Sequence, residues 1–424
     1  MAGSAFGSGR SRSAEMPRLG YAARRLMPGS SVPAPDGTAT SPGSLPIRLI
    51  VSCTAAWVIS QLSYNALPQL LDPIKEAFDR GDEVVTRLYG YELFVFALVA
   101  LAAAGPLARL SRVRVALTGG VIAVAAGVAS SWTDSYSALV VCRVMLGIGG
   151  ALVGAAGTAA AASASNPERV FGLITIGSSV VLACEPALLE LWALGPHGLT
   201  GGFYAIAAAT ALMMPVLIWL DPGRPSQPET GSNPWSAILR APNRAIAVAA
   251  MIAMFIYETG QGGIWTYIAE LGQRSDLEGQ LFGNVLSAAQ LLGLSGSFLA
   301  IWIGDRWGTM GPLVIGIGVN AAASVGLGLC ENPYAYVGLI VLRIASYYFI
   351  IPYVLGLMAK LDNLGRWAVA VDAAWWLGDA AGPPLAGMIV ERSGIEMLAA
   401  LPLCTGIVCI VIFLRTLRRF GSQR

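Results

Sequence analysis

The residues best suited to chemistry are a few ionisable side chains inside long apolar runs of the sequence. They are Glu92, Arg143, Glu185, Glu190, Glu258, Arg343, Asp372 and Asp379. A charge inside hydrocarbon is costly, so such residues are by default functional candidates that face a protein interior or a wet cavity. Desolvation favours the neutral form of a buried carboxyl, which lets it load and release a proton near physiological pH. We therefore predict proton coupling by Glu185, Glu258, Asp372 and Asp379.

Two short stretches align polar and aromatic side chains on one face of a helix. Residues three and four apart share a face, and glycines nearby permit close approach or local unwinding. The aligned residues are Glu258, Gln261 and Trp265 in one stretch and Gln61, Tyr64 and Asn65 in the other. Amides beside aromatic rings suit binding of a small ligand, and we predict this role for Gln61, Tyr64, Asn65, Gln261 and Trp265. The alternative is that these groups only bond and pack neighbouring helices.

The predicted proton-coupling carboxyls also have alternative roles. Asp372 and Asp379 are seven residues apart, which returns them to nearly the same helix face. The alternative for Asp372 is that it lies near the membrane surface and caps its helix or pairs with Arg366. Glu185 precedes Pro186, which kinks a helix, so this pair predicts either a gate or ordinary packing.

Arg143 and Arg343 are permanently charged and can hold a carboxylate with two parallel hydrogen bonds. We predict that Arg143 binds an anionic substrate. The alternative for Arg143 is an ion pair with Glu92, Glu185 or Asp379, because an unpaired buried guanidinium is expensive.

The composition indicates a membrane protein. Of the 424 residues, 55% are hydrophobic and only 12% are charged, and the mean hydropathy is positive. A soluble domain has roughly a quarter charged residues. The six cysteines show no disulfide or zinc spacing, and no ATP-binding loop is present. We expect no cofactor, no metal and no nucleic-acid partner.

The apolar runs predict twelve spans of about twenty residues, the length that crosses roughly 30 Å of hydrocarbon. They cover residues 47–71, 89–110, 113–132, 136–164, 170–194, 201–220, 245–272, 281–304, 310–330, 334–360, 367–390 and 396–417. Residues 1–46, rich in Gly, Ser, Pro and Arg, form a predicted disordered tail. The proline-rich link 221–244 separates two predicted bundles, 47–220 and 245–417, and residues 418–424 form a second tail.

The positive charges predict the orientation of the chain. Most of the 27 Lys and Arg residues lie in the tails and the even-numbered links. The odd-numbered links hold only Lys75, Arg80, Arg87, Arg274 and Arg392. Loops rich in Lys and Arg stay in the cytoplasm. Both termini are therefore expected to be cytoplasmic. The preference for Arg over Lys is compatible with a bacterial inner membrane, and a plasma-membrane location is expected.

Several features repeat at an almost constant offset, which indicates a duplicated chain. Arg143 and Arg343 are 200 positions apart, as are Gln61 and Gln261. Two basic links repeat at 199 positions. The first contains Gly105, Leu107, Arg109, Arg112 and Arg114, and the second contains Asp305, Arg306 and Gly308. Arg143 is followed by closely spaced glycines at positions 147, 149, 150 and 154.

With these motifs in these links, the chain after residue 46 resembles the major facilitator superfamily of twelve-helix secondary transporters. The resemblance implies an all-α integral membrane fold, with twelve transmembrane helices in two pseudosymmetric six-helix bundles. It implies that the first and seventh helices line a central cavity. It also implies that Arg109, Arg112, Asp305 and Arg306 fasten a gate on the inner side.

The expected function is secondary active transport of a small organic solute, aromatic or anionic, by alternating access with proton coupling. We expect a monomer in a lipid bilayer and no enzyme activity. Two alternatives stay open. A solute sensor without flux would have the same binding site. A membrane-embedded enzyme would need a cluster of acid, base or metal ligands, and the sequence shows only scattered carboxyls and one histidine.

Overall fold

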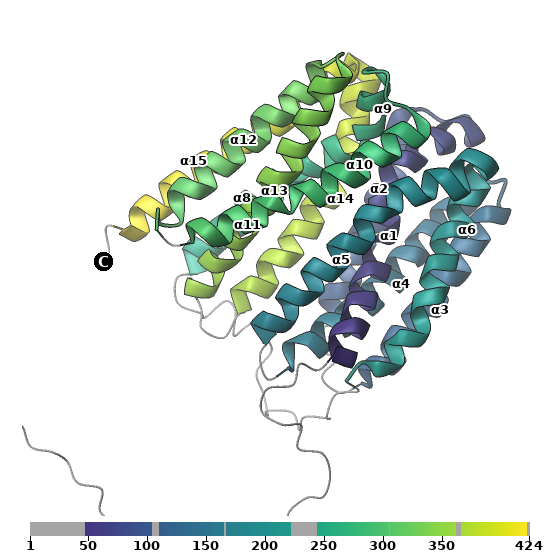
Figure 1. The fold of residues 1–424 in the computed structure, drawn as a ribbon, viewed down its shortest axis with the longest axis horizontal. Helices are drawn as coiled ribbons and strands as arrows, with labels where there is room; N and C mark the ends of the chain where they lie inside the picture. The colour runs from purple at the N-terminus through teal and green to yellow at the C-terminus, as the bar shows by residue number, and fades with distance from the viewer. Residues whose placement is uncertain are drawn as a thin grey trace, which may run out of the picture. The chain divides into compact units, whose positions relative to one another are not determined.

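The computed structural model describes residues 47–103, 110–164, 167–221, 244–304, 306–361 and 366–421, and the elements in this part of the chain are helices (Figure 1). The first half contains α1 Ile47–Phe78, α2 Asp82–Ala103, α3 Arg112–Trp132, α4 Tyr136–Ala162, α5 Pro167–Leu189, the π-helical turn η2 Glu190–Leu194, α6 Gly195–Met213 and the 3₁₀ turn η3 Met214–Trp219. The predicted tail 1–46, most of the predicted link 221–244 and residues 422–424 lie outside the described residues.

The second half repeats the pattern with more breaks. It contains α8 Arg244–Thr266, α9 Ile268–Gln273, α10 Gly279–Gly293, α11 Ser295–Ile303, α12 Met310–Leu329, α13 Pro333–Leu361, α14 Arg366–Ser393, the 3₁₀ turn η4 Ile395–Ala399 and α15 Ala400–Gly421. Two predicted spans are interrupted, one at Tyr267 between α8 and α9 and one at Leu294 between α10 and α11.

Ten helical stretches of the described residues are long and apolar enough to cross a membrane. One of them, Val170–Trp219, holds both α5 and α6, which Gly198 separates with a non-helical backbone (φ 59°, ψ −154°). The 28-residue α14 is not among the ten, although it has the length to cross. When α5 and α6 are counted separately and α14 is added, the described residues are consistent with the twelve predicted crossings.

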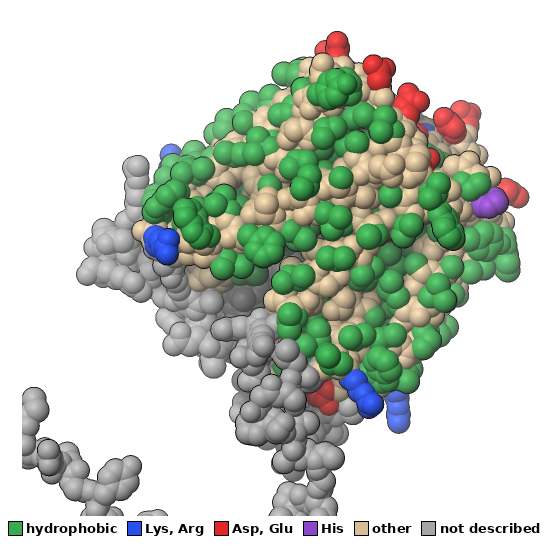
Figure 2. Space-filling view, viewed as in Figure 1, with side chains coloured by type: hydrophobic (Ala, Val, Ile, Leu, Met, Phe, Trp, Pro, Cys, Tyr) green, Lys and Arg blue, Asp and Glu red, His purple; other side chains and the backbone are tan. Residues whose placement is uncertain are grey.

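The two ends of the helices differ in the sign of their charged side chains. Figure 2 shows most of the visible Asp and Glu side chains near α9 and α10, and Lys and Arg side chains at the opposite end. We name the end that holds Asp72, Asp82 and Glu270 the acidic end, and the end that holds Arg112 and Arg306 the basic end. Both ends belong to the segment 46–424, which is one compact unit.

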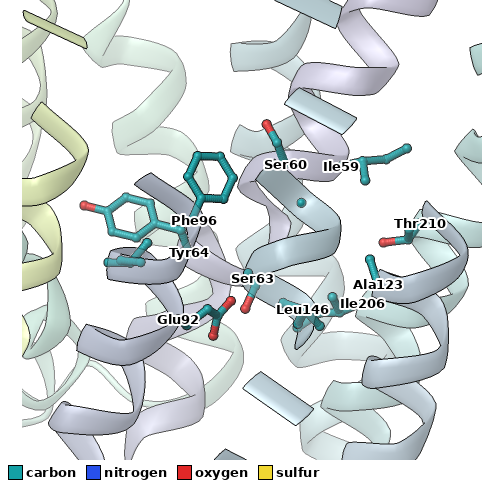
Figure 3. Close-up of a pocket in the computed structure, with 13 residues that line it drawn as sticks. Ile59, Ser60, Ser63, Tyr64, Glu92, Phe96, Ala123, Leu146, Ile206 and Thr210 are labelled. Carbon is teal, nitrogen blue, oxygen red and sulfur yellow. The ribbon is translucent and has the colours of Figure 1, made fainter. Parts of the chain in front are cut away.

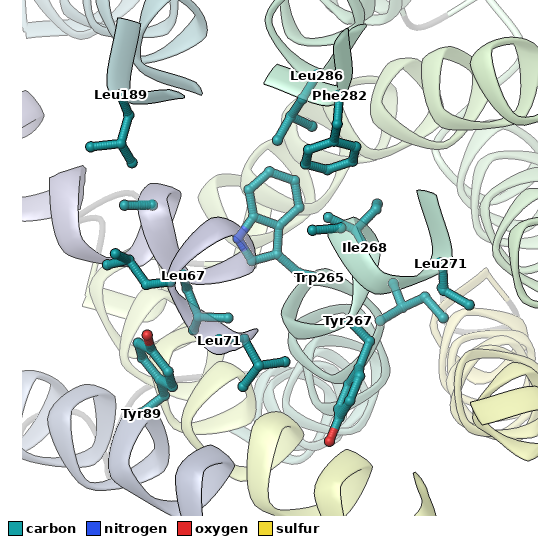
Figure 4. Packing of buried hydrophobic residues seen from close by; sticks show 14 of the residues in the cluster. Leu67, Leu71, Tyr89, Leu189, Trp265, Tyr267, Ile268, Leu271, Phe282 and Leu286 are labelled. Atoms are coloured by element: carbon teal, nitrogen blue, oxygen red, sulfur yellow. The ribbon is translucent and has the colours of Figure 1, made fainter. Parts of the chain in front are cut away.

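The hydrophobic clusters show where the two halves join. One cluster draws on both halves at the acidic end and includes Leu67, Leu71, Trp265, Leu271 and Phe282 (Figure 4). The other two clusters are confined to single halves, one around Ala116 and Val153 and one around Leu313 and Val354. Apolar burial therefore seals the halves together at the acidic end, whereas towards the basic end each half has a core of its own.

An ionic network reinforces the acidic end. Lys75 of α1 lies 2.7 Å from Asp72, 3.0 Å from Asp82 of α2 and 3.2 Å from Glu270 of α9. The hydroxyl of Tyr267 donates to the same Asp82 Oδ1 at 3.0 Å. Asp82, Lys75 and Glu270 thus tie the first half to the second.

Glycines bring α8 and α14 into very close contact. A Cβ atom on Gly382 would lie 2.6 Å from the backbone nitrogen of Gly263 and 2.7 Å from the carbonyl oxygen of Thr259. The glycines of α8 had predicted either close approach or local unwinding. Because α8 is helical through Thr266, they serve close approach.

We predict that Gly382→Ala lowers the stability of the protein by about 1–3 kcal/mol, because the added methyl group meets backbone atoms that cannot move aside. The measurement is the apparent melting temperature of purified protein in detergent. Gly338→Ala is the matched control, since nothing lies within 4 Å of a Cβ there. Equal melting temperatures for Gly382→Ala and wild type would contradict the contact.

We predict that Lys75→Gln weakens the closure of the acidic end, because three carboxylates would then face one another without a cation. The reporter is Ser287→Cys of α10, whose wild-type hydroxyl accepts a 3.1 Å hydrogen bond from the backbone of Ala187 in α5. The introduced thiol should react several-fold faster with a maleimide when Lys75 is replaced. The exposed Cys184 and Cys404 are changed to serine in both proteins. An unchanged rate would show that the network does not hold this end closed.

Candidate functional site

A cavity of about 310 Å³ lies between the two halves. Helices α1 and α5 of the first half line it together with α8, α10, α13 and α14 of the second. On α1 the lining runs from Trp57 to Asn65, and the next residues towards the acidic end, including Leu67 and Leu71, are buried in the shared cluster. The cavity therefore extends from the sealed acidic end towards the basic end, and its volume is that of a small-molecule site.

The structure brings the two predicted polar stripes together in this cavity. Gln61, Tyr64 and Asn65 of α1 and Gln261 and Trp265 of α8 all line it. The Trp265 Nε1 donates to the Tyr64 carbonyl oxygen at 3.2 Å, and the two rings stack with centroids 6.3 Å apart. The first and seventh predicted spans thus touch across the boundary between the halves.

Further residues line the cavity that no sequence pattern predicted. Gln290 of α10, Tyr347 and Tyr348 of α13, and Trp375 and Trp376 of α14 complete the aromatic and amide lining. The Tyr347 and Trp375 rings meet edge to face with centroids 5.6 Å apart. These aromatics lie in apolar runs, where core packing and ligand binding leave the same pattern.

Two buried carboxyls lie at the junction of α8 and α14. Asp379 lines the cavity, is 2% exposed and accepts a hydrogen bond from the Tyr64 hydroxyl at 3.2 Å. Glu258 is fully buried behind the lining and accepts a weaker bond from the Tyr347 hydroxyl at 3.4 Å. The Tyr64 bond joins the two halves, so the charge of Asp379 acts on the contact between them.

The other predicted proton-coupling residues lie apart from this pair. Glu185 accepts a 2.8 Å hydrogen bond from the Asn65 side chain, and Asn65 in turn accepts a 3.4 Å bond from Gln290 of the second half. Glu185 is therefore linked to the cavity wall through Asn65. The side chain of Asp372 lies outside the described residues.

Arg143 lies outside the cavity lining. Its guanidinium is 3.6 Å from Glu92, donates to the Ser63 hydroxyl at 3.0 Å and lies over the Phe203 ring. This is the ion-pair alternative with Glu92. A void of about 20 Å³ beside Glu92, lined by Ser63 and other residues of the first half, is large enough for one water molecule (Figure 3).

Arg343, the repeat counterpart of Arg143, does line the cavity. It donates to the Gln261 carbonyl oxygen at 3.1 Å and to its side-chain oxygen at 3.0 Å. The Gln261 amide donates to Asn320 at 2.7 Å, and Asn320 donates to the Arg343 carbonyl oxygen at 2.9 Å. Both repeat arginines therefore connect the fourth span of their half to its first, but only Arg343 faces the cavity.

Two of the predicted gate residues lie within the described part of the chain. Arg112 pairs with Asp221 at 3.2 Å and donates to the Ser163 hydroxyl at 2.8 Å. Arg306 lies over the Trp302 ring. Both are at the basic end. Arg109 and Asp305 lie outside the described residues.

Solved structures of similar fold exist. Two structures of a bacterial homolog of the human lysosomal transporter Spinster match, one in an inward-facing, unoccupied conformation and one in an inward-facing, occupied conformation. The first has a TM-score of 0.66 at 16% identity and covers 89% of this chain and 94% of its own. The second has a TM-score of 0.70 at 14% identity and covers 90% and 99%. At these identities the likeness concerns the fold.

Two comparisons use the sequence. No curated protein matches the chain by sequence. The family model described as Major Facilitator Superfamily matches residues 54–361, which is most of the chain. This match and the fold agree with the basic links and paired polar stripes of the sequence. The chain belongs to the major facilitator superfamily of membrane transporters.

Proposed function

We propose that this protein is a secondary active transporter that moves a small organic solute by alternating access and is driven by protons. The observation that carries the proposal is the cavity between the two halves, which is sealed at one end and has a buried carboxyl, Asp379, in its wall. Substrate sites of transporters with internal repeats lie at such a boundary near the middle of the membrane.

The sealed end supports an inward-facing assignment. Loops with many Lys and Arg residues stay in the cytoplasm, so the basic end with Arg112 and Arg306 is assigned to the cytoplasm together with both termini. The acidic end, closed by Lys75 and the shared apolar cluster, then faces outward. The two bacterial structures of similar fold are also inward-facing. We assign the protein to the plasma membrane as a monomer.

The proton coupling follows from the bond between Tyr64 and Asp379. An ionised Asp379 accepts a charge-assisted hydrogen bond from Tyr64 of the other half. Protonation removes that charge and weakens a contact between the halves, which favours their relative movement. Glu258, buried on the neighbouring helix, interacts electrostatically with Asp379 and shares in the charge balance. The proton and the movement of the halves are thereby linked.

The residues at the two ends of the cavity take gating roles in this proposal. Lys75 and its three carboxylate partners close the outer side in the described conformation. Arg112, Arg306 and their links belong to the inner side, which must close when the outer side opens. The Glu185–Asn65–Gln290 chain of hydrogen bonds spans both halves at the level of the cavity and supports a coupling role for Glu185.

We predict that Asp379→Asn abolishes solute accumulation driven by an inward proton gradient, because Asn cannot change its charge. Glu258→Gln should reduce accumulation at least tenfold for the same reason. The measurement is uptake and counterflow of a panel of small organic solutes in proteoliposomes, with and without the gradient. Solute exchange without a gradient should survive in both variants.

Asp276→Asn is the control, because it removes an exposed carboxyl that is not part of the cavity lining. Full gradient-driven accumulation by Asp379→Asn would contradict proton coupling at this site. If the wild-type protein binds solutes but shows no flux, the protein is a sensor, and the transport proposal fails.

A further inference from the structure

Arg343 is a buried cation in the cavity wall that interacts with Glu258 and Asp379 only at longer range than a direct ion pair. Its side chain is 4% exposed, and among the described residues no carboxylate oxygen lies within 4.0 Å of its guanidinium. Its Nε atom has no hydrogen-bond partner. Arg143, the repeat counterpart, has Glu92 at 3.6 Å. The duplicated chain has therefore kept one arginine as a structural ion pair and presents the other to the cavity.

The guanidinium of Arg343 is held in place by neutral groups. Gln261 accepts from it with two oxygens, and Asn320 fixes both Gln261 and the Arg343 backbone. These bonds orient the fork of donors but do not neutralise its charge. An unpaired buried guanidinium is expensive, so an anion that enters the cavity gains both a charge partner and an oriented pair of donors.

The carboxyls nearest to this site are already engaged by hydroxyl groups. Asp379 accepts from Tyr64, and Glu258 accepts from Tyr347. Both interact electrostatically with Arg343, but in the described residues neither forms a direct ion pair with it. Their protonated forms, which the proposed proton coupling requires, leave Arg343 as the charged group of the cavity wall.

The other side chains that line the cavity favour a particular kind of uncharged group in the ligand. Tyr64, Trp265, Tyr348, Trp375 and Trp376 surround the cavity and present ring faces and edges. Aromatic rings pair with one another in stacked or edge-to-face arrangements, which favours a flat ring in the ligand. The cation and the rings lie in one space of about 310 Å³.

We propose that the transported solute is an aromatic organic anion whose carboxylate binds the Arg343 guanidinium and whose ring lies among the tryptophans and tyrosines of the cavity. This inference rests on the proposed transport function and deepens it by naming the substrate class. Gln261 is a positioning residue for the arginine.

The test is binding of matched acids and amides to the purified full-length protein, measured by isothermal titration calorimetry in detergent. The probes are benzoate, phenylacetate, indole-3-acetate and 2-naphthoate, each with its primary amide. At least one acid should bind about tenfold or more tightly than its amide, the ratio expected for one charge-assisted pair. Tryptamine, a cationic indole, should bind no better than indole-3-acetamide.

The variants separate this inference from a general loss of structure. Arg343→Gln keeps a donor towards Gln261 and should reduce the affinity for the acid to that for the amide. Arg343→Lys keeps the positive charge but loses the paired donors of the guanidinium, and it should give an intermediate ratio of acid to amide affinity. Arg87→Gln is the control, because it removes a half-exposed arginine outside the cavity lining, and it should leave the acid-to-amide ratio unchanged.

Three binding results would overturn the inference: no acid of the panel binds, acids and amides bind equally, or the acid preference survives in Arg343→Gln. Proton-driven flux of neutral or cationic solutes would overturn it while the transport function stands. Absence of flux for all solutes, with the acid preference intact, would overturn transport and leave Arg343 as the anion site of a sensor.

Discussion

The structure depends on the cost of placing a charge in the low-dielectric interior of a membrane protein. Polar partners around several buried ionisable groups limit that cost. Arg143 is paired with Glu92, Asp379 accepts from a tyrosine, and Arg343 is held by the amide oxygen and carbonyl of Gln261. Since the last two groups line the cavity between the halves, their charge can be balanced by a proton or a ligand as well as by the protein.

The two halves are joined at one end only, and this determines where a change of charge in the cavity acts. Apolar side chains and the Lys75 network join the halves at the acidic end, whereas each half keeps a separate core towards the basic end. The bond from Tyr64 to Asp379 and the contact of Trp265 with Tyr64 lie between these regions. A change of charge in the cavity thus acts where the closed and separate regions meet.

The sequence was informative where hydropathy or helical spacing produces a regular pattern along the chain. Hydropathy predicted the spans. Helical spacing placed Gln61 and Tyr64 on one helix face and Gln261 and Trp265 on another, and the family resemblance implied that both helices line one cavity, where the structure places these residues. Spacing could not distinguish Arg143 from Arg343, because their partners come from other helices. Tyr347 and Tyr348 sit in an apolar run in which core and cavity residues look alike. The contact of Lys75 with Glu270 joins residues 195 positions apart in the chain and leaves no local pattern.

Alternating access requires the acidic end to open during transport. Asp72 of α1 and Gln273 of α9 are joined across the halves by a 2.9 Å hydrogen bond, so cysteines at both positions can be bridged by a short bis-methanethiosulfonate. We predict that the bridged protein still binds solute from the basic end but transports none, and that reduction restores transport. Single-cysteine proteins treated with the reagent should transport normally. Undiminished transport by the bridged protein would show that the acidic end need not open.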